Sequence, residues 1–516
     1  MIRYPYENFY AMLHRITGEN PSKKVIFVEG KNYTYQQFLD QVDRFARALE
    51  LIDVQTGDRI ALIAPNGLPF VMSIFAVSKL GAVIVPINTM LKNEEYRYIL
   101  KDCRAKVLIT GAKFAKEVQT LGSEVESIEH TIWIDNAPSV DEHHLVLEEI
   151  LSDHVHTHAS YTSSMLDETA VIFYTSGTTG HPKGAMISNR NLFSNLMGAK
   201  ERFDLRPSDR FIVYLPMFHS FTFSIMVMLP FFTRSSFVIV PSILPFSTII
   251  KETLLKRVSI FMGVPDIYNA LIRAKLPWYF LWFNSIRCFI SGGSALSEDT
   301  LNKFHATFKR SQMLEGYGLS ECSPAVAINP LDKQKPLSVG LPLSGYEVKI
   351  VNEEMLELPV GEAGELIIRG DCVMQGYLNS IEATHETIQN GWLRTGDIAK
   401  LDEEGYIYIV DRIKDLIISK GINIYPRQIE EQMMLLPSVK LAAVIAQKDL
   451  YSGEIPIAFI ELESGFEATT TAHIKLQLKE HLAAFKIPKT ITVVESLPKT
   501  ATGKVLKRVL KQQGNH

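Results

Sequence analysis

The residues with the clearest chemical potential lie in a loop rich in glycine and hydroxyl side chains, residues 174–184 (YTSGTTGHPKG). The loop follows an apolar run that predicts a strand and precedes a helical pattern that starts near Asn189. Such a loop can turn backbone N–H groups and hydroxyls towards a polyphosphate, and Lys183 adds a positive charge. Its spacing differs from GxxxxGK[ST] because Gly184 follows the lysine. The pattern predicts a phosphate-binding loop, with a flexible surface loop as the alternative.

Three further motifs place charged and aromatic groups beside glycine-rich turns. Residues 315–321 (EGYGLSE) combine an aromatic ring, two glycines, a hydroxyl and carboxylates. Residues 393–397 (LRTGD) put a carboxylate in a turn, and residues 498–504 (PKTATGK) end in a lysine after a flexible glycine. Each charged residue could also be a solvated surface charge, and Tyr317 could be a core aromatic. The combination is far more specific than any single motif.

Together with Asp411 and Arg412, these motifs make the chain strongly resemble the superfamily of adenylate-forming acyl-CoA synthetases, firefly luciferases and adenylation domains. The resemblance covers the whole chain. It is closest to bacterial fatty-acid–CoA ligases, on residues 316–324 (GYGLSECSP) and 421–426 (GINIYP). It implies that ATP activates a carboxylic acid to acyl-AMP, which coenzyme A then converts to a thioester, with release of pyrophosphate and AMP. ATP, Mg²⁺ and coenzyme A are the cofactors that it implies.

The resemblance also implies roles for residues around the nucleotide. The β- and γ-phosphates of ATP would be held by Thr175, Ser176, Gly177, Thr178, Thr179, Gly180 and Lys183. Tyr317 would stack on adenine, next to Gly318. Ser320 would contact the α-phosphate, and Glu321 would coordinate Mg²⁺. The family commonly has Thr where this chain has Ser320, but serine keeps the hydroxyl.

Further roles concern the ribose and the reacting carboxylate. Asp397 would accept hydrogen bonds from the ribose hydroxyls, with Arg412 nearby, and Lys504 would bridge the substrate carboxylate and the α-phosphate. This assignment is physically coherent, because a carboxylate that attacks the phosphorus of a polyanion meets repulsion. Cations and oriented donors must therefore gather around the developing charge. Lys504, Mg²⁺ on Glu321 and the phosphate loop are groups of that kind.

Related enzymes rotate a small C-terminal domain between their two half-reactions, which makes Asp411 the candidate hinge. In the first state Lys504 would face the active site. In the second state residues 419–424 (SKGINI), including Lys420 and Gly421, would replace it and line the tunnel for coenzyme A. Gly421 suits a place where a slim thiol arm passes the backbone. An ordinary hairpin glycine is the alternative.

The acid substrate is predicted from the lining of the acyl pocket. By resemblance, the pocket includes His219, Phe221, Gly292, Gly293, Ser294 and Gly316. These surroundings offer no obvious carboxylate to pair with an ammonium group, which disfavours amino acids. A medium- or long-chain fatty acid is the first expectation, and an aromatic acid of the coumarate or benzoate kind is the second. His219 is expected to gate or shape the pocket, or simply to pack there, rather than to act as a base.

Two other functions remain open at this point. The enzyme could deliver the acyl group to an acyl carrier protein instead of coenzyme A. Alternatively, the chain could be a nucleotide-binding sensor without catalysis, although the complete set of Glu321, Asp397, Lys504 and the phosphate loop argues against that.

The elements that position these residues alternate strands with helices. Strand-like runs at residues 59–64, 82–87, 106–110 and 169–174 alternate with helical patterns at 68–80 and 93–102, which predicts parallel βαβ units. Short turn-bounded runs at 338–410 predict a β-rich subdomain. The fold class is therefore α/β: residues 1–410 form a large N-terminal AMP-binding domain of two parallel-rich αβ subdomains plus the β-rich one. Residues 411–516 form a small mobile α+β C-terminal domain, with helical patterns at 428–436 and 473–484.

Composition narrows the class of protein further. The 516 residues contain 53 Lys and Arg against 57 Asp and Glu, a formal net charge of −4, which gives no bias towards nucleic acid. Four cysteines without a CxxC pair, and a start without an apolar signal core, predict a cytoplasmic protein. The apolar region 211–246 is too interrupted for a membrane helix and predicts core.

An aromatic run at residues 276–283 (LPWYFLWF) has two interpretations. It could be core, which is the more common outcome, or it could make a peripheral contact with a membrane that supplies fatty acid. Residues 154–158 (HVHTH) lack supporting ligands for zinc. The sequence does not predict an oligomeric state.

Overall fold

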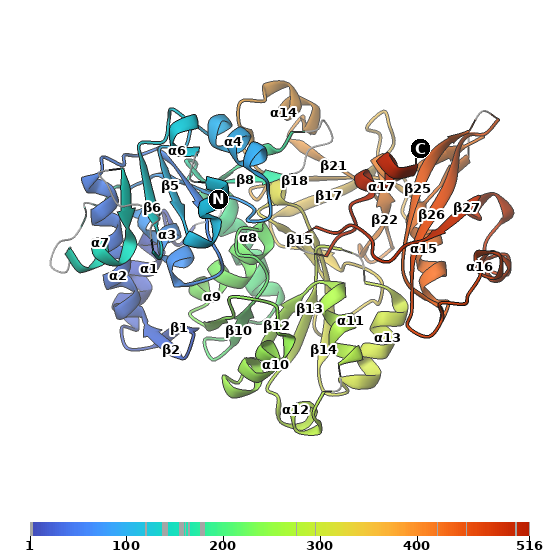
Figure 1. Cartoon of the computed structure of the whole chain (residues 1–516), viewed down its shortest axis with the longest axis horizontal. Helices are drawn as coiled ribbons and strands as arrows, with labels where there is room; N and C mark the ends of the chain where they lie inside the picture. Colours follow the sequence, from blue (N-terminus) through green and yellow to red (C-terminus); the bar gives the residue numbers. More distant parts are fainter. Residues whose placement is uncertain are drawn as a thin grey trace.

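The computed structural model describes residues 4–118, 121–136, 143–153, 159, 161–163, 166–175, 181–274, 276–294, 296–420, 422–449, 451–500 and 503–514. Within these ranges the strands form two large sheets, a smaller antiparallel sheet and a separate C-terminal sheet. Figure 1 shows the C-terminal sheet at the right, beside the N-terminal sheets. This arrangement confirms the predicted α/β architecture.

The first αβ subdomain is built on an eight-stranded sheet in the order β19-β9-β8-β4-β3-β5-β6-β7. Its strands are β3 (Arg59–Ile63), β4 (Val83–Pro86), β5 (Val107–Thr110), β6 (His130–Trp133), β7 (His144–Val146), β8 (Thr169–Thr175), β9 (Lys183–Ser188) and β19 (Gly376–Tyr377). The pairs from β8 to β7 are parallel, whereas β9 pairs antiparallel with β8 and β19. Strands β4 and β5 are buried at every position, as expected of a parallel sheet that is covered on both faces.

The second αβ subdomain contains a nine-stranded sheet in the order β16-β15-β14-β13-β12-β10-β11-β1-β2. Its strands are β1 (Lys24–Val28), β2 (Lys31–Thr34), β10 (Arg210–Val213), β11 (Ser236–Ile239), β12 (Ile260–Gly263), β13 (Cys288–Ser291), β14 (Gln312–Gly318), β15 (Ala325–Ile328) and β16 (Leu341–Pro342). The strands from β1 to β14 run parallel in this order. Their carboxyl ends therefore meet at one edge of the sheet and their amino ends at the other.

The β-rich subdomain and the C-terminal domain each have a five-stranded sheet. The first contains β17 (Tyr346–Val351), β18 (Gly364–Gly370), β20 (Ile388–Gln389), β21 (Trp392–Leu401) and β22 (Ile407–Arg412). The second contains β23 (Ile417–Ser419), β24 (Ile422–Ile424), β25 (Val439–Asp449), β26 (Gly453–Leu462) and β27 (Thr490–Val493). The chain thus leaves the N-terminal part at the end of β22.

Helices pack around these sheets, and two apolar cores of the N-terminal part are separate from those of the C-terminal domain. The helices are α1 (Phe9–Glu19), α2 (Tyr35–Leu51), α3 (Leu68–Lys79), α4 (Asn93–Asp102), α5 (Ala115–Val118), α6 (Leu121–Glu124), α7 (Leu147–Asp153), α8 (Asn189–Arg202), α9 (Leu229–Phe232), α10 (Phe246–Leu255), α11 (Pro265–Arg273), α12 (Trp278–Phe283), α13 (Glu298–Thr307), α14 (Ile381–Thr387), α15 (Pro426–Met434), α16 (Thr471–Leu478) and α17 (Lys507–Gly514). Short turns of other helical types are η1 (Ala112–Phe114), η2 (Thr222–Met228), η3 (Ser320–Cys322), η4 (Ile413–Asp415) and η5 (Ala484–Lys486).

Two sequence-based expectations about helices and apolar runs have clear outcomes. The helix expected at 473–484 ends at Leu478, and residues 484–486 form a 3₁₀ turn ahead of Pro488, whose ring disfavours continuation of a helix. Residues 211–240 fold into largely buried strands and helical turns, as predicted, whereas residues 241–245 form a mostly exposed loop in which Leu244 is 76% exposed. In the described part of the chain, no helix has the length and apolarity needed to cross a bilayer.

Candidate active site

Strand β14 presents the first group of predicted site residues at its carboxyl end. Gly316, Tyr317 and Gly318 close the strand, and Ser320 and Glu321 follow in the turn η3. A Cβ on Gly318 would lie 2.0 Å from the carbonyl oxygen of Pro324, so only glycine allows the chain to turn back so closely. The tight return fixes the positions of Tyr317, Ser320 and Glu321.

Asp397 is the centre of a hydrogen-bonded group. The hydroxyl of Tyr317 donates to Oδ2 of Asp397 at 2.6 Å, and Nε of Arg412 lies 2.9 Å from Oδ1. Strands β21 and β22 set this geometry, because Asp397 and Arg412 are direct partners in their register. Although burial opposes its charge, the Asp397 carboxylate raises the pKa of the Arg412 guanidinium. Each oxygen of Asp397 retains one lone pair, which suits it to accept from two ribose hydroxyls.

Lys504 joins this group from the C-terminal domain. Burial, and next the charge of Arg412, lower the pKa of Lys504 to about 8, and Asp397 partly offsets them. Burial, and next the charge of Lys504, lower the pKa of His219 to about 4. Lys504 is therefore electrostatically coupled to Arg412 and to two residues of the N-terminal part, Asp397 and His219, all of which the sequence had singled out.

A hairpin and an ion pair position Lys504. The backbone N–H of Thr500 donates to the carbonyl oxygen of Lys504 at 2.8 Å, and the N–H of Lys504 donates to Oγ1 of Thr500 at 3.1 Å. Nζ of Lys499 lies 2.8 Å from Oδ2 of Asp266, at the start of α11. This pair ties the hairpin to the N-terminal part.

Glu321 lies among hydroxyl groups. Its Oε1 accepts hydrogen bonds from Oγ1 of Thr175 at 3.3 Å and from the hydroxyl of Tyr377 at 3.0 Å. Nζ of Lys183 lies 5.4 Å from the ring centre of Tyr377. The structure thus brings together the two described ends of the phosphate loop, Thr175 and Lys183, and the predicted metal ligand. Ser176, Gly177, Thr178, Thr179 and Gly180 lie outside the described residues.

The donor set at Glu321 suits Mg²⁺ bound with a nucleotide. Mg²⁺ keeps several waters and is usually held by one or two carboxylates together with phosphate oxygens. One carboxylate, fixed by two hydroxyls next to Lys183 of the phosphate loop, meets that requirement. No cluster of three or more His, Cys, Asp or Glu residues suited to a metal occurs within the described ranges. Glu321 and its neighbours therefore fit Mg²⁺ that would be bound together with phosphate.

Two hydroxyl residues at the site were not predicted. Tyr377 reaches Glu321 from β19, a two-residue strand without a motif of its own. Ser220 shares a hydrogen bond of 2.8 Å with Ser320, between the two Oγ atoms. Only its position next to His219 could have drawn attention to Ser220.

The predicted acyl-pocket residues fall into two sets. A Cβ on Gly292 would lie 3.7 Å from the ring of Phe221 and 3.8 Å from the carbonyl oxygen of Gly316, so these three residues adjoin. His219 belongs with them, because its Nδ1 accepts from the N–H of Phe221 at 3.3 Å. Gly293 and Ser294 lie on the exposed side of the same turn. Burial keeps His219 neutral near pH 7, which fits a residue that shapes the pocket.

Asp411 joins the last N-terminal strand to the first C-terminal helix. Its Oδ1 accepts from the N–H of Arg412 at 2.7 Å, and its Oδ2 accepts from the N–H of Arg427 at 2.9 Å. Arg427 is the second residue of α15, so the carboxylate satisfies a free N–H at the start of that helix. Burial raises the pKa of Asp411.

The hairpin predicted to line the tunnel for coenzyme A lies on the C-terminal domain. Lys420 is exposed and adopts a φ of 51°, and its N–H donates to the carbonyl oxygen of Ser452. The N–H of Ile418 in the same hairpin donates to Glu454. Gly421 lies outside the described residues, as do His154, His156 and His158.

The aromatic run at 276–283 is not core. Phe280 is buried, but Trp278, Trp282 and Phe283 are 69%, 66% and 67% exposed. The more common interpretation of such a run is therefore wrong for these residues. Helix α12 turns a single ring inward and the others towards solvent.

The fold and these groups are those of an adenylate-forming enzyme, with the residues predicted to bind the nucleotide on a large domain and a lysine supplied by a small one. The chain belongs to the AMP-binding enzyme family. The family model described as AMP-binding enzyme matches residues 13–378, and that described as AMP-binding enzyme C-terminal domain matches residues 428–504.

Individual relatives agree with this assignment. A long-chain-fatty-acid–CoA ligase of Bacillus subtilis (strain 168) is 32% identical over 537 residues, which cover 99% of this chain and 95% of the relative. A feruloyl-CoA synthase of an Amycolatopsis species is 32% identical and covers 93% of both chains. The crystal structure of the anthranilate CoA ligase AuaEII in complex with anthranoyl-AMP superposes with a TM-score of 0.91 at 29% identity, covering 99% of this chain and 98% of that one. The predicted class, an AMP-forming acid–CoA ligase that uses ATP, is confirmed.

Proposed function

We propose that this enzyme converts a fatty acid to its coenzyme A thioester through an acyl-adenylate, with the residue roles predicted from the sequence. The observation that carries the proposal is that the Lys499–Asp266 ion pair ties the hairpin of Lys504 to the N-terminal part, where the charge of Lys504 is coupled to those of Arg412 and Asp397. Lys504 supplies the cation that the reacting carboxylate needs, and Asp397 supplies the carboxylate that the ribose needs.

The proposed chemistry assigns a task to each group around the nucleotide. Asp397 holds the ribose, and Tyr317 presents its ring to adenine while its hydroxyl fixes Asp397. Lys504 draws the substrate carboxylate to the α-phosphorus and stabilises the charge that develops there. Mg²⁺ bound at Glu321 would neutralise phosphate charge. Ser320 orients its hydroxyl with the help of Ser220.

A fatty acid suits the surroundings of the predicted acyl pocket. Gly292 lies against Phe221 and Gly316, and His219 next to Phe221 is neutral, so these residues present no charge to a substrate tail. An aliphatic chain gains about 0.8 kcal/mol for each buried CH₂ group, whereas a buried ammonium without a partner is costly. The feruloyl-CoA synthase relative supports an aromatic acid as the second candidate.

The test is pyrophosphate release across saturated fatty acids of increasing length and across coumarate and benzoate, with and without coenzyme A. For a fatty-acid enzyme, kcat/KM should rise by about fourfold for each added CH₂ until the pocket is full. A flat series with high activity on coumarate would support the aromatic alternative. Acyl-AMP that accumulates without turnover of coenzyme A would support transfer to a carrier protein. No acid-dependent release would refute the proposal and support a sensor.

We also propose that residues 1–410 and 411–516 move relative to each other between the half-reactions, with Asp411 as hinge. Support comes from its place at the last N-terminal strand and from its bond to the start of α15. Rotation would remove Lys504 and bring the hairpin of Lys420 and Gly421 to the site. The Lys499–Asp266 pair, which ties the hairpin of Lys504 to the N-terminal part, would break in that motion.

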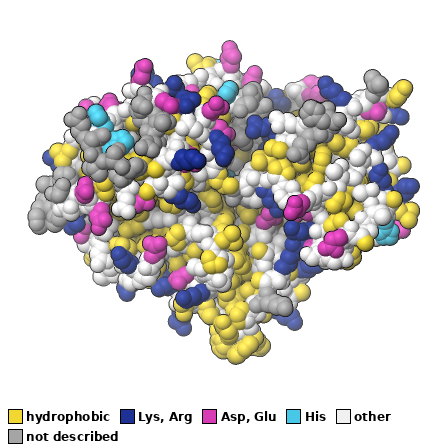
Figure 2. All heavy atoms as spheres, in the orientation of Figure 1, with side chains coloured by type: hydrophobic (Ala, Val, Ile, Leu, Met, Phe, Trp, Pro, Cys, Tyr) yellow, Lys and Arg dark blue, Asp and Glu magenta, His cyan; other side chains and the backbone are white. Residues whose placement is uncertain are grey.

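We propose in addition that α12 makes a peripheral contact with a membrane. Figure 2 shows hydrophobic side chains gathered at the lower tip of the molecule, where Figure 1 places α12. Tryptophan and tyrosine favour the interface of a bilayer, and nearby cations attract anionic lipids. Arg310 is exposed, and its guanidinium lies 5.7 Å from the ring centre of Trp282. Aromatic rings beside an exposed cation suit an anionic membrane surface.

Co-sedimentation with vesicles that contain anionic lipid tests this contact. If Trp278 and Trp282 each contribute about 1.5 kcal/mol on insertion, changing both to alanine should weaken binding on the order of 100-fold. Tyr451→Ala is the matched control, because Tyr451 is 89% exposed but lies on the C-terminal domain. Unchanged sedimentation of the double variant would exclude docking through α12.

A further inference from the structure

A pocket of about 510 Å³ lies at the edge of the nine-stranded sheet where the parallel strands begin. Lys24 opens β1, Arg210 opens β10, and Ser236 opens β11, and Arg210 and Ser236 are register partners. The proposed catalytic residues follow the carboxyl ends of the same sheet. Four residues of a strand span about 13 Å, so the pocket is separate from the candidate active site.

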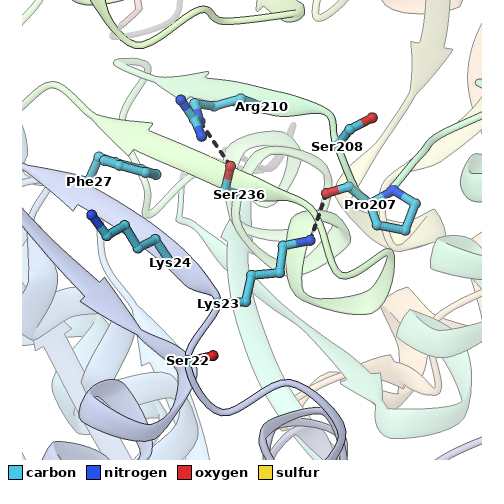
Figure 3. A pocket seen from close by; sticks show the side chains of 8 residues that line it. All are labelled: Ser22, Lys23, Lys24, Phe27, Pro207, Ser208, Arg210 and Ser236. Carbon is cyan, nitrogen blue, oxygen red and sulfur yellow. Dashed lines mark hydrogen bonds between the residues drawn. The ribbon is translucent and has the colours of Figure 1, made fainter.

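The lining of the pocket combines three cations with three hydroxyl groups and contains no acidic residue. The lining residues are Ser22, Lys23, Lys24, Phe27, Pro207, Ser208, Arg210 and Ser236. Figure 3 shows the charged side chains of Lys23, Lys24 and Arg210 around the opening, with Phe27 as one wall. The whole chain has a formal net charge of −4, so this cluster does not follow from a generally basic surface.

Hydrogen bonds around the pocket hold two of these cations, Lys23 and Arg210, in place without neutralising them. Nζ of Lys23 donates to the carbonyl oxygens of Pro207, at 2.7 Å, and of Arg234. Nε of Arg210 donates to Oγ of Ser236 at 3.0 Å, and another nitrogen donates to the carbonyl oxygen of Lys256. The guanidinium of Arg210 lies 4.4 Å from the ring centre of Phe27, and Nζ of Lys256 lies 5.8 Å from it.

Carboxylates do not compensate this charge. Among the described residues, Lys23, Lys24, Arg210 and Lys256 have no ion pair with an Asp or Glu side chain within 4.0 Å. Burial, and next the charges of Arg210 and Arg234, lower the pKa of Lys23, and burial lowers that of Arg210. Half-buried like charges are costly to hold together, and an anion between them would remove that cost.

We propose that this pocket is a binding site for a phosphate monoester, distinct from the site of adenylation. Arg210 and Lys24 would supply charge-assisted bonds to the phosphate oxygens, and the hydroxyls of Ser208 and Ser236 are within the lining to complete them. The volume exceeds that of a phosphate ion and falls in the range of small-molecule sites, so an organic group attached to the phosphate fits as well. The phosphate could belong to a free metabolite or to the headgroup of an anionic lipid.

The test is the rate at which individual lysines of the whole enzyme are acetylated. Peptide mass spectrometry measures this rate for each lysine. Inorganic phosphate or glycerol 3-phosphate should slow the labelling of Lys24 and Lys256, by about tenfold at a concentration ten times the Kd. Lys31, exposed on the neighbouring strand β2, is the control within the molecule and should label at an unchanged rate. Saturating ATP and Mg²⁺ occupy the active site and should not alter the protection.

Two variants and two lipid mixtures complete the test. Lys24→Glu should abolish the protection of Lys256 by phosphate, whereas Lys31→Glu should retain it, and both should release pyrophosphate at the wild-type rate. Protection by phosphatidylcholine vesicles that contain phosphatidate, but by neither dissolved phosphate, assigns the site to a lipid headgroup; protection by the dissolved compounds assigns it to a free phosphate. Absence of protection in every arm, or equal slowing at Lys31, overturns the proposal.

Discussion

The dependence of adenylation on the charge of Lys504 gives the most direct prediction. Burial and the neighbouring Arg412 lower the pKa of this amine to about 8, so it loses its proton well below the pH at which an exposed lysine does. A lysine with that pKa is about one-tenth protonated at pH 9. We therefore expect kcat/KM for acid-dependent pyrophosphate release to fall about tenfold between pH 7 and pH 9.

Substitution assigns this loss of activity to one residue. Lys504→Arg keeps a positive charge throughout this range, so its pH profile should be flat to pH 9, at a lower absolute rate. Lys479→Arg, at an exposed lysine of the C-terminal domain, should keep the wild-type profile. Bound ATP adds negative charge near Lys504, so the corresponding loss in kcat should occur at a higher pH than in kcat/KM. A loss near pH 8 that persists in Lys504→Arg would refute the reasoning.

The half-reactions provide an independent check of the same residue. Lys504→Gln should lower pyrophosphate release on the order of 100- to 1000-fold, the cost of removing one stabilising group from a developing charge. Thioester formation from a synthetic acyl-adenylate and coenzyme A should change far less, because Lys504 would then lie away from the site. Equal losses in both assays would show that the substitution disturbs the fold.

Three further predictions follow from other contacts. Tyr377→Phe removes the hydrogen bond to Glu321 and should weaken Mg²⁺ binding about tenfold, measured by Mg²⁺ titration of pyrophosphate release; Tyr408→Phe is the control. Asp411→Pro should slow thioester formation more than pyrophosphate release in single-turnover assays, since it stiffens the proposed hinge; equal loss in both would count against it. With its pKa lowered to about 4, His219 stays neutral down to about pH 5, so the pH profile of pyrophosphate release should show no step near pH 6.5. The His219→Ala enzyme should have the same pH profile but a different preference for acyl chain length.

The sequence predicted the parts of the fold whose signal is local. The runs at 59–64 and 106–110 are strands because apolar residues follow one another after a single leading charge, Arg59 or Lys106, and they match β3 and β5 closely. Strand β9 was not predicted, because the glycine-rich loop before it is the stronger local signal. Residues 183–188 pair back on β8, so the loop connects a hairpin and the helix begins only at Asn189.

Pairing between distant segments could not be predicted. Strands β1 and β2 lie about 200 residues before β11 in the chain, and yet β1 pairs with β11. No periodicity within either segment specifies the partner. The role of Tyr377 could not be predicted for the same reason, because its contact with Glu321 depends on the pairing of the two-residue strand β19 with β9.

The aromatic helix α12 shows a different limit. Composition gives the hydrophobicity of residues 278–283 but not the side of the helix that finds a partner. Phe280 is buried and Leu281 also packs against the core, while Trp278 and Trp282, which are four residues apart, share an exposed face. The exposed face of α12 depends on the neighbouring elements that pack against its other side.

Charge explains why a lysine on a separate domain suits this chemistry. Burial and the charges of Arg412 and Lys414 oppose the protonation of Lys504, whereas Asp397 favours it. The phosphates of ATP would reverse that balance, so the closed arrangement gains stability when substrate binds. Pyrophosphate release would then remove much of the negative charge that attracts Lys504, Arg412 and Lys414, all of which belong to residues 411–516. We therefore expect departure of the C-terminal domain to become favourable only after adenylation, because the attraction that would promote the first half-reaction would be lost before the second.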